Sequence, residues 1–506
     1  MMKEKEFIEG LPRARWHQEQ RLADFLKQSS ATLFGREHGF SDIDSLEKFR
    51  KNVPLCEYSD LTPYIDRILS GEKDILFAGL PYCYLSSSGS SSGKAKILPM
   101  SQAYFTDIYN PFLHLYMSAL MRHCNHVRSD WDATINFKWD PLYRPATLAN
   151  GALHLGVSQV DLNQSFQNEG LSEPGTRSPW SQVPEAIDCP VERLYYRIRL
   201  AAKHDIRQIV GINPAVIAAL PDLLEKHADR LIEELRLGVY GDAQIDAPDE
   251  LLALRLVRER LRDGKLLPRH LWPRMRSLLC WDQGIASLYL PNVVPLYGNE
   301  CSVIAPPLGA SESPLTMNLP AHGIKNVLAY RSSFYEFIDV QDGQNRPLLL
   351  DELQQGGHYR VVVTHMSGLY RYVLGDIVKV SGFSGQAPEL EYMGRYNALN
   401  PVTESVLIEA VARAASRESV AIRNFTFSQR DDDIVLRLEL KKDELSVLPS
   451  TELQMRFLET VNEQIGGQRI ADLTLETAGT FSESWLYKVS SGLRPPQVKD
   501  KVWGGL

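Results

Sequence analysis

Apolar residues recur at intervals of three and four in the first quarter of the chain, which predicts amphipathic helices there. In the first of them, Leu22, Phe25 and Leu26 fall on one face. Proline or glycine follows the next two, as is typical of a helix end. The predicted helices cover residues 13–34, 45–53, 60–69 and 101 to about 122.

The middle of the chain alternates strand-like and helical patterns. Short strands are predicted over 133–138 and 152–160, and the polar stretch 163–183 is interpreted as a surface excursion. Long helices follow over 191–203, 222–237 and 250–261. From Met275 onward, the pattern predicts strands over 287–290, 293–297, 333–340, 358–364 and 377–382. Interleaved helices and strands of this kind predict an α/β or mixed α+β body.

The pattern changes after Arg395 to a compact alternation of helices and strands. The helices are predicted over 405–415 and 451–465, and the strands over 421–428, 434–440 and 471–477. We therefore predict a large N-terminal domain of residues 1–396, a hinge at 397–400 and a small C-terminal α/β domain of residues 401–506.

Composition narrows the class of protein. With 506 residues, 44% of them hydrophobic, the chain is long enough for a large core and more than one domain. The net charge of −8 and the lack of a basic block argue against a nucleic acid partner. No apolar run reaches the length of about 18 residues that a membrane span requires, and the N-terminus has no signal-peptide pattern. The six cysteines are scattered singly, as is typical of a protein of the reducing cytoplasm, so we expect a cytoplasmic protein. Without a predicted membrane span, we expect no membrane partner. Nothing in the sequence indicates the oligomeric state.

The most informative stretch is Ser86-Ser-Ser-Gly-Ser-Ser-Ser-Gly-Lys-Ala-Lys96, which lies between two apolar segments. Gly89 and Gly93 permit backbone conformations that other residues avoid, and successive N–H groups in such a turn form an anion-binding nest. The hydroxyls add donors, and the lysines add positive charge, so the stretch suits a polyphosphate. The alternative, a disordered Ser/Gly linker, needs neither the two lysines nor the tight apolar flanks.

The P-loop, GxxxxGK[ST], is the first phosphate-binding motif to compare with this stretch. Gly89 and Gly93 enclose three residues rather than the four of the P-loop. Ala95 follows Lys94 at the place where the P-loop needs a hydroxyl for Mg²⁺. The sequence therefore argues against a P-loop.

Ser87 to Lys96 instead resembles the SSGTSxGxxK loop of the plant auxin- and jasmonate-conjugating acyl-acid amido synthetases and their bacterial relatives, within the adenylate-forming superfamily. Tyr370 to Phe383 is similar to the YRY..GD.V.V.GF segment of that family. The lead-in Pro54 to Gly71 and the tail Gly492 to Lys499 are also similar to those of the family. The resemblance thus extends over nearly the whole chain.

The resemblance implies an adenylate-forming architecture, in which β-sheets flanked by helices form the large domain and the small C-terminal domain is mobile. It implies ATP and Mg²⁺ as cofactors. In the loop, the implied ATP-binding residues are Ser87, Ser88, Gly89, Ser90, Ser91, Gly93 and Lys96.

Further ATP-binding residues are implied beyond the loop. Asp376, beside Gly375, can accept both ribose hydroxyls; the alternative is a turn aspartate. Arg395 resembles the arginine that closes the large domain and reaches phosphate. Tyr370 belongs to the same YRY..GD segment as Asp376 and is included in the predicted ATP site.

Tyr297-Gly-Asn299-Glu300 resembles the YxSSE segment of the family but is one residue shorter. In that segment the aromatic residue packs near adenine, and the glutamate binds Mg²⁺, a hard cation that takes oxygen ligands. Tyr297, Asn299 and Glu300 are therefore predicted ATP-site residues, with Glu300 as the metal ligand. The short motif leaves the register of Tyr297 and Asn299 open, and the alternative for Glu300 is a surface carboxylate.

Two departures from the family lie in the C-terminal region. Pro401 to Glu404 lacks the lysine that the family often carries just past the hinge, and Asp500-Lys501 stands where Pro-Arg is usual. Lys499 stays a candidate for meeting the α-phosphate or the acyl carboxylate, with a solvated surface lysine as its alternative. The predicted catalytic residues are accordingly Lys499, Glu300 and Arg395.

An aromatic stripe follows the loop in the predicted helix 101 to about 122. Such a stripe is usually core, but it can also line a pocket for an apolar or aromatic acid, so Tyr109, Phe112 and Tyr116 are candidate acyl-substrate residues. Two histidines at 123 and 126 lack further ligands for a metal site. No GxSxG sequence supports a serine hydrolase.

Taken together, the residues and the family resemblance imply an ATP-dependent carbon–nitrogen ligase. A small-molecule carboxylic acid would become an acyl-adenylate, and an amine, an amino acid by family resemblance, would receive the acyl group. One alternative is an acyl-CoA synthetase, which shares the first step and ends in a thioester. A second alternative is a catalytically silent nucleotide-binding protein, because the hinge lysine is missing and the tail is altered. The sequence identifies neither the acid nor the amine.

Overall fold

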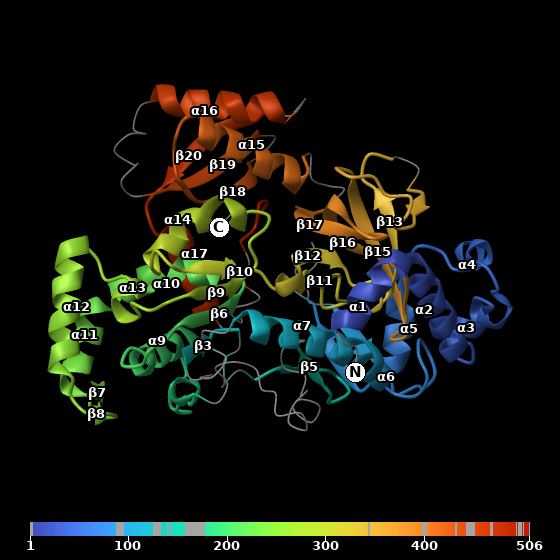
Figure 1. Ribbon diagram of the computed structural model, residues 1–506, viewed down its shortest axis with the longest axis horizontal. Coiled ribbons are helices and arrows are strands. Elements are labelled where there is room, and N and C mark those ends of the chain that lie inside the picture. Colours follow the sequence, from blue (N-terminus) through green and yellow to red (C-terminus); the bar gives the residue numbers. More distant parts are fainter. Residues whose placement is uncertain are drawn as a thin grey trace. The chain divides into compact units, whose positions relative to one another are not determined.

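The computed structural model describes residues 4–87, 96–124, 133–138, 140, 142, 144–156, 178–342, 345–396, 402–430, 433–441, 451–465, 469–491, 493, 498 and 500–504. Figure 1 shows the chain coloured along its sequence. Its contacts divide it into two compact units of three segments each. Unit 1 comprises Met1–Cys124, Arg144–Leu171 and Pro307–Ala398; unit 2 comprises Asn125–Tyr143, Ser172–Pro306 and Leu399–Leu506.

The N-terminal part of unit 1 is helical, as the spacing of apolar residues predicts. The predicted helix 13–34 is divided in two, because the Thr32 side chain accepts a hydrogen bond from the Gly35 N–H and caps a new helix. The predictions for 45–53 and 60–69 are confirmed. The helices are α1 (Glu4–Gly10), α2 (Ala14–Ser29), α3 (Leu33–Glu37), α4 (Leu46–Asn52) and α5 (Tyr58–Leu69).

A β-hairpin forms the stem of the Ser/Gly loop in unit 1, with Ser86 opposite Ile97. Its apolar residues Leu85 and Leu98 are buried in a core with Phe25 of α2, which explains the apolar segments on both sides of the loop. The strands of its sheet, in spatial order, are β2 (Ile97–Met100), β1 (Cys83–Ser86), β5 (Leu153–Leu155) and β4 (Ala146–Thr147).

The helical segment after β2 begins at Ser101, whose side chain caps it by accepting from the Tyr104 N–H. The segment is not one continuous α-helix. It consists of α6 (Gln102–Tyr104), a π-helical turn (Phe105–Tyr109) and α7 (Asn110–His123).

The largest sheet of unit 1 has seven strands, and every neighbouring pair in it is antiparallel. The strands predicted over 333–340, 358–364 and 377–382 are confirmed, although the last is part of a much longer strand. In spatial order they are β11 (Thr316–Leu319), β12 (Ile324–Leu328), β17 (Ala387–Arg395), β16 (Leu369–Ser384), β15 (His358–His365), β13 (Phe334–Asp339) and β14 (Pro347–Leu348).

Unit 2 contains a parallel sheet, whose strands in spatial order are β10 (Ser302–Ile304), β9 (Ser277–Cys280), β6 (Gln208–Ile212) and β3 (Thr134–Asn136). A parallel sheet is buried, and residues of these strands pack in one core with helices of the same unit. The helices are α9 (Pro190–Ala201), α10 (Pro214–Lys226), α11 (Ala228–Leu237), α12 (Glu250–Asp263), α13 (Pro268–Leu271) and α14 (Ala286–Val293).

The strands predicted over 287–290 and 293–297 are wrong, because this segment forms α14 and a following 3₁₀ turn. A short apolar run does not by itself distinguish a strand from a buried helix. The buried residues of α14 show the helical spacing: Ala286, Tyr289, Leu290 and Val293. The predicted helix 222–237 is also divided, at His227, between α10 and α11.

The C-terminal segment of unit 2 follows the predicted alternation. Its helices are α15 (Glu404–Arg417), α16 (Thr451–Gln464) and α17 (Thr480–Ser490), and its sheet consists of β18 (Ile422–Arg430), β19 (Asp433–Leu440) and β20 (Ile470–Glu476). β19 pairs antiparallel with β18 and parallel with β20. The predicted hinge 397–400 lies outside the described residues, so the division into domains 1–396 and 401–506 stays a prediction.

The helices of the described residues are short to moderate in length. α2, for example, has 16 residues and carries charged side chains along its length. Within the described ranges, none of the helices has both the length and the apolar character needed to cross a membrane.

Candidate active site

The two ends of the Ser/Gly loop lie together at the top of the β1–β2 hairpin. The Ser87 N–H donates to the Lys96 carbonyl at 3.4 Å, one step beyond the paired strands. Of the predicted loop residues, Ser87 and Lys96 are described; Ser88, Gly89, Ser90, Ser91 and Gly93 lie outside the described residues. The hairpin therefore sets where the loop begins and where its last lysine stands.

The Lys96 ammonium is held between two aromatic rings. Its Nζ donates to the Tyr372 hydroxyl at 2.8 Å and lies 5.6 Å from the ring centre of Tyr58. The Tyr58 hydroxyl in turn accepts from the Ile97 N–H at 2.8 Å. Burial raises the pKa of Tyr372, so this phenol stays neutral and serves as the acceptor for the lysine. These contacts fix a cation at the end of the predicted phosphate loop.

Asp376 and Arg395 are opposite residues on the neighbouring strands β16 and β17. The Arg395 Nε lies 3.5 Å from the Asp376 Oδ1. Asp376 is partly exposed, with 19% of its side chain accessible. Next to this pair, the Tyr396 N–H donates to the carbonyl of Gly375, the residue before Asp376, at 2.7 Å. The sheet register thus brings together the two residues predicted to meet ribose and phosphate.

Glu312 joins this group, although the sequence reasoning missed it. Its side chain is buried, with 7% of the residue exposed, and burial raises its pKa. The positive charges of Lys96 and Arg395 lower that pKa, and the negative charge of Asp376 raises it, so all three side chains lie near Glu312. Four charged groups from segments far apart in the sequence therefore converge in unit 1: Lys96, Glu312, Asp376 and Arg395.

The loop that carries Glu312 is fixed by hydrogen bonds on both sides of it. The Ser311 hydroxyl donates to the Ser86 carbonyl at the end of β1, at 3.3 Å. The Tyr335 hydroxyl donates to the Pro314 carbonyl at 2.5 Å. Glu312 is thereby tied both to the stem of the Ser/Gly loop and to the large sheet.

One signal in the sequence points to Glu312. The window Leu308-Gly-Ala-Ser-Glu312 has the full five-residue length of the YxSSE segment and keeps its final Ser-Glu. It lacks the leading tyrosine, which the segment at Tyr297 has. The tyrosine therefore drew the assignment to the shorter window that ends at Glu300.

Tyr297, Asn299 and Glu300 belong to unit 2, whereas Lys96 and Asp376 belong to unit 1. Tyr297 is fully buried, and its hydroxyl donates to the carbonyl of Ile217 in α10 at 2.6 Å. Asn299 is exposed. Glu300 is exposed as well and forms an ion pair with Arg276. Their predicted roles in ATP binding stay predictions.

Tyr370 lies in the core of unit 1. Its hydroxyl donates to the Leu76 carbonyl at 3.0 Å, and its ring stacks on Phe34 with centroids 5.0 Å apart. The next residue, Arg371, is also buried and pairs with the buried Glu336 at 2.8 Å. The described contacts of Tyr370 are those of a packing residue, and its predicted ATP contact stays a prediction.

The acyl-substrate candidates lie on the π-helical turn and α7. Tyr109 is half-buried, and Phe112 and Tyr116 are buried. Two other aromatic residues of the stripe, Tyr104 and Phe105, pack in the core around β1 and β2. Tyr109, Phe112 and Tyr116 stay predicted acyl-substrate residues.

Lys499 lies outside the described residues, but the residue after it is well anchored. The Tyr289 hydroxyl of α14 donates to Asp500 at 2.8 Å, and the Asn424 side-chain amide of β18 donates to it at 2.9 Å. Burial raises the pKa of Asp500. The departure from the family's Pro-Arg therefore has a structural role in unit 2.

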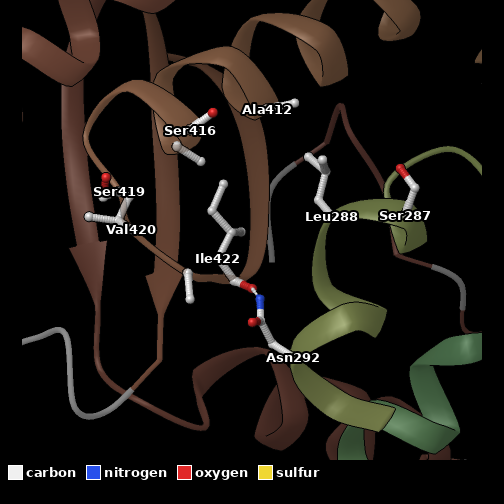
Figure 2. A pocket seen from close by; sticks show the side chains of 10 residues that line it. Ser287, Leu288, Asn292, Ala412, Ser416, Ser419, Val420 and Ile422 are labelled. Carbon is white, nitrogen blue, oxygen red and sulfur yellow. Dashed lines mark hydrogen bonds between the residues drawn. The ribbon is translucent and has the colours of Figure 1, made fainter. Parts of the chain in front are cut away.

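Unit 2 also contains an open pocket of about 410 Å³ beside α14 and α15, shown in Figure 2. The Asn292 side chain at its floor donates to the Ile422 carbonyl at 3.0 Å. Its lining consists of apolar, hydroxyl and amide residues without an ionisable group: Ser287, Leu288, Asn292, Ala412, Ala415, Ser416, Ser419, Val420, Ala421 and Ile422. It contains none of the predicted site residues and offers no acid–base chemistry.

Comparison with known proteins identifies close matches in sequence and fold. The family model "GH3 family N-terminal domain" matches residues 4–301, and "GH3 family central domain" matches residues 326–395. The 4-substituted benzoates-glutamate ligase GH3.12 of Arabidopsis thaliana is 26% identical over an alignment of 403 positions, which covers 74% of this chain and 68% of that protein. The probable indole-3-acetic acid-amido synthetase GH3.1 of Arabidopsis thaliana is 25% identical over an alignment of 548 positions, which covers 97% of this chain and 90% of that protein.

A solved structure confirms the predicted mixed α/β fold class. The GH3.15 acyl acid amido synthetase in complex with 2,4-DB superposes with a TM-score of 0.80 at 20% identity and covers 99% of this chain and 93% of its own. The predicted class of enzyme, an acid–amino acid ligase, is confirmed by the named relatives. Because a family model matches more than half of its residues, the chain belongs to the GH3 family, the group of acyl-acid amido synthetases that its motifs resemble.

Proposed function

We propose that this GH3 protein uses ATP to activate an aromatic carboxylic acid as its acyl-adenylate and transfers the acyl group to an amino acid. The observation that carries the proposal is the convergence of Lys96, Glu312, Asp376 and Arg395 at the stem of the Ser/Gly loop in unit 1. Two cations, one partly exposed carboxylate and one buried carboxylate suit a nucleotide with its phosphates and metal ion.

In the first step, an oxygen of the acid's carboxylate attacks the α-phosphorus of ATP. The bond from that phosphorus to the oxygen bridging to the β-phosphate breaks, and pyrophosphate leaves. Lys96, Arg395 and the donors of the Ser/Gly loop would stabilise the charge that develops on the phosphoryl oxygens. Asp376 would accept hydrogen bonds from the ribose hydroxyls and so hold the α-phosphate in place.

The chemistry of Glu312 fits a magnesium ligand better than that of Glu300. Glu312 is a buried carboxylate whose pKa is raised by burial, and it accepts from its own N–H. Glu300 is exposed and already paired with Arg276. When bound, Mg²⁺ supplies positive charge that neutralises the phosphates. We therefore propose Glu312 as the carboxylate that holds it.

In the second step, the amine nitrogen attacks the acyl carbon, the bond to the AMP oxygen breaks, and AMP leaves while the nitrogen loses a proton. The family resemblance supports Lys499 as a group that approaches the α-phosphate or acyl carboxylate. It also supports rotation of residues 401–506 about a hinge at 397–400 between the two steps. No covalent enzyme intermediate is required.

The named relatives support the proposed substrate classes. One is named as a ligase of 4-substituted benzoates with glutamate, and the other as an indole-3-acetic acid-amido synthetase. Both acids are aromatic. Tyr109, Phe112 and Tyr116 would supply an aromatic lining of matching chemistry. A cytoplasmic location, where ATP and free amino acids are abundant, is part of the same proposal.

Product analysis by mass spectrometry tests the proposal. The protein is incubated with ATP, Mg²⁺ and a panel of substituted benzoic and indolic acids, and either a mixture of amino acids or CoA is added. We expect an acyl-amino acid and AMP only where both an acid and an amino acid are present. An acyl-CoA product with no amide would favour the acyl-CoA synthetase instead, and ATP binding without any product would favour a silent nucleotide-binding protein.

A further inference from the structure

The turn that joins β15 to β16 carries a buried histidine next to the proposed ATP site. His365 is the last residue of β15, is fully buried, and lies seven residues before Tyr372, the hydrogen-bond partner of Lys96. Its Nε2 lies 2.9 Å from the carbonyl oxygen of Glu312. His365 is thus a side chain that hydrogen-bonds to the main chain of Glu312 itself.

The second ring nitrogen determines the tautomer of His365. Nδ1 accepts from the Ser367 N–H at 3.2 Å, so it carries no proton. Nε2 therefore carries the proton and donates it to the Glu312 carbonyl. Both nitrogens are engaged, and the ring has one orientation.

The same turn reaches the stem of the Ser/Gly loop. The Ser367 hydroxyl accepts from the Ser101 N–H at 2.9 Å and also lies 2.9 Å from the Ser101 hydroxyl. Ser101 directly follows β2, the strand that leaves the Ser/Gly loop. The turn therefore connects three segments of the proposed site: the Glu312 loop, the loop stem and β16.

We propose that His365 is a positioning residue for the adenylation step. Its Nε2–H fixes the Glu312 carbonyl, so that the carboxylate of Glu312 faces Lys96, Asp376 and Arg395 and is ready to hold Mg²⁺ with ATP. The inference rests on the proposed function of this site. Hydrogen bonds that orient a ligand in this way commonly contribute about 10- to 100-fold to metal affinity.

A packing role alone would not need the hydrogen bond. The His365 ring contacts the Tyr104 ring with centroids 4.8 Å apart, and a phenylalanine would preserve such a contact. A phenylalanine would, however, leave the Glu312 carbonyl without this donor. A glutamine can place an N–H near the position of Nε2. His365→Phe and His365→Gln therefore separate volume from hydrogen bonding.

His270 of unit 2 supplies a matched control. It too is buried and neutral in the same tautomer, because its Nδ1 accepts from the Leu267 N–H at 3.1 Å and its Nε2 lies 2.8 Å from Asp263. His270→Phe removes an equivalent buried histidine outside the proposed ATP site.

The experiment measures ATP binding by calorimetry over a range of Mg²⁺ concentrations, without any acid, in the wild-type protein and the three variants. We expect His365→Phe to lower the Mg²⁺-dependent part of the ATP affinity about 10-fold or more, and His365→Gln to restore most of it. His270→Phe should leave it unchanged. Thermal unfolding of each variant reports the structural cost separately.

Equal ATP affinity in wild type and His365→Phe would overturn the positioning role while leaving the proposed function intact. The same conclusion would follow if His365→Gln were no better than His365→Phe. If the wild-type protein bound ATP without any dependence on Mg²⁺, the metal site at Glu312 would itself be wrong, and the positioning role would fail with it.

Discussion

Glu312 and Glu300 are the two candidates for the Mg²⁺ ligand, and their side chains differ in burial and in the charges around them. Glu312 is buried among the charges of Lys96, Asp376 and Arg395. Glu300 is 72% exposed and paired with Arg276 at the surface. Exposed ion pairs contribute little free energy, whereas a buried carboxylate has a strong electrostatic demand for a positive partner. Position in the structure therefore favours Glu312.

Glu312→Gln and Glu300→Gln make this choice testable. Each change removes a charge and keeps the volume. Glu312→Gln is expected to lower kcat of adenylation about 100-fold, because one electrostatic group of the reacting centre is lost. Glu300→Gln should change it less than about twofold. Pyrophosphate release with saturating acid measures both effects. A larger loss in Glu300→Gln than in Glu312→Gln would support Glu300 as the metal ligand instead.

Asp376→Asn tests the ribose contact. Two charge-assisted hydrogen bonds would weaken, so the KM for ATP should rise about 10- to 100-fold, while the KM for the acid changes far less. Asp339→Asn, at the end of β13 in the same sheet, is the matched control and should change neither constant. If the two KM values rose together in Asp376→Asn, the ribose assignment would be refuted.

At the level of single residues, the sequence was most informative for charged side chains within a matched motif. Lys96, Asp376 and Arg395 were found in this way, and the structure brings them together. Aromatic residues were harder to assign, because Tyr370 and Tyr297 are buried whatever their role. Glu312 was missed because Tyr297 drew the assignment to Glu300. No local pattern in the sequence shows that Glu312 lies near Asp376 and Arg395, whose pairing depends on the sheet register.

At the level of elements, periodic patterns predicted the long helices and the strands of the large sheet. The failure at 287–297 has a physical reason, since β-branched and aromatic residues favour a strand while the spacing of the buried residues is helical. The parallel sheet of unit 2 was mostly missed, because its strands are short and are buried along their length, so they show no alternation of buried and exposed positions.

Gly368 in the turn between β15 and β16 illustrates an element that depends on one residue. It has a φ of +89°, and a Cβ there would lie 2.4 Å from the Cβ of Leu76. Gly368→Ala should therefore lower the free energy of unfolding by about 2–4 kcal/mol. Gly356→Ala is the control, since Gly356 also has a positive φ, of +85°, but open space around it. Its cost should be about 1 kcal/mol.

Denaturant unfolding of both variants measures the difference. The close approach to Leu76 accounts for the excess cost of Gly368→Ala. Equal costs for the two variants would mean that backbone conformation alone accounts for the effect.

The anchored tail of unit 2 gives a prediction about pH. Burial raises the pKa of Asp500, so folding favours its protonated form. The stability that this group contributes is full below the ordinary aspartate pKa and is lost as pH rises through the raised value. Relative to Asp500→Asn, the wild type should therefore gain unfolding free energy as pH falls from neutral toward about 4.

The quantity to measure is the difference in unfolding free energy between the wild type and Asp500→Asn across this pH range. Because both proteins share every other titrating group, the difference isolates Asp500. A difference that stays constant, or that changes in the opposite direction, would contradict the raised pKa.

At the level of the whole molecule, each unit is assembled from three separate chain segments. The Cys56 N–H donates to the Arg371 carbonyl in unit 1, and the Asn213 side chain donates to the Val498 carbonyl in unit 2. Local patterns contain no information about such pairings. The domain division at 397–400 is a prediction from the sequence and the family resemblance.

The most direct test of the central claim is acid-dependent exchange of labelled pyrophosphate into ATP. The step is reversible, so an enzyme that forms an acyl-adenylate returns label to ATP only when its acid is present. We predict exchange that requires Mg²⁺ and an aromatic acid, proceeds without an amino acid, and is lost in Glu312→Gln but kept in Glu300→Gln. Well-folded protein that shows no exchange with any acid of the panel would contradict the account.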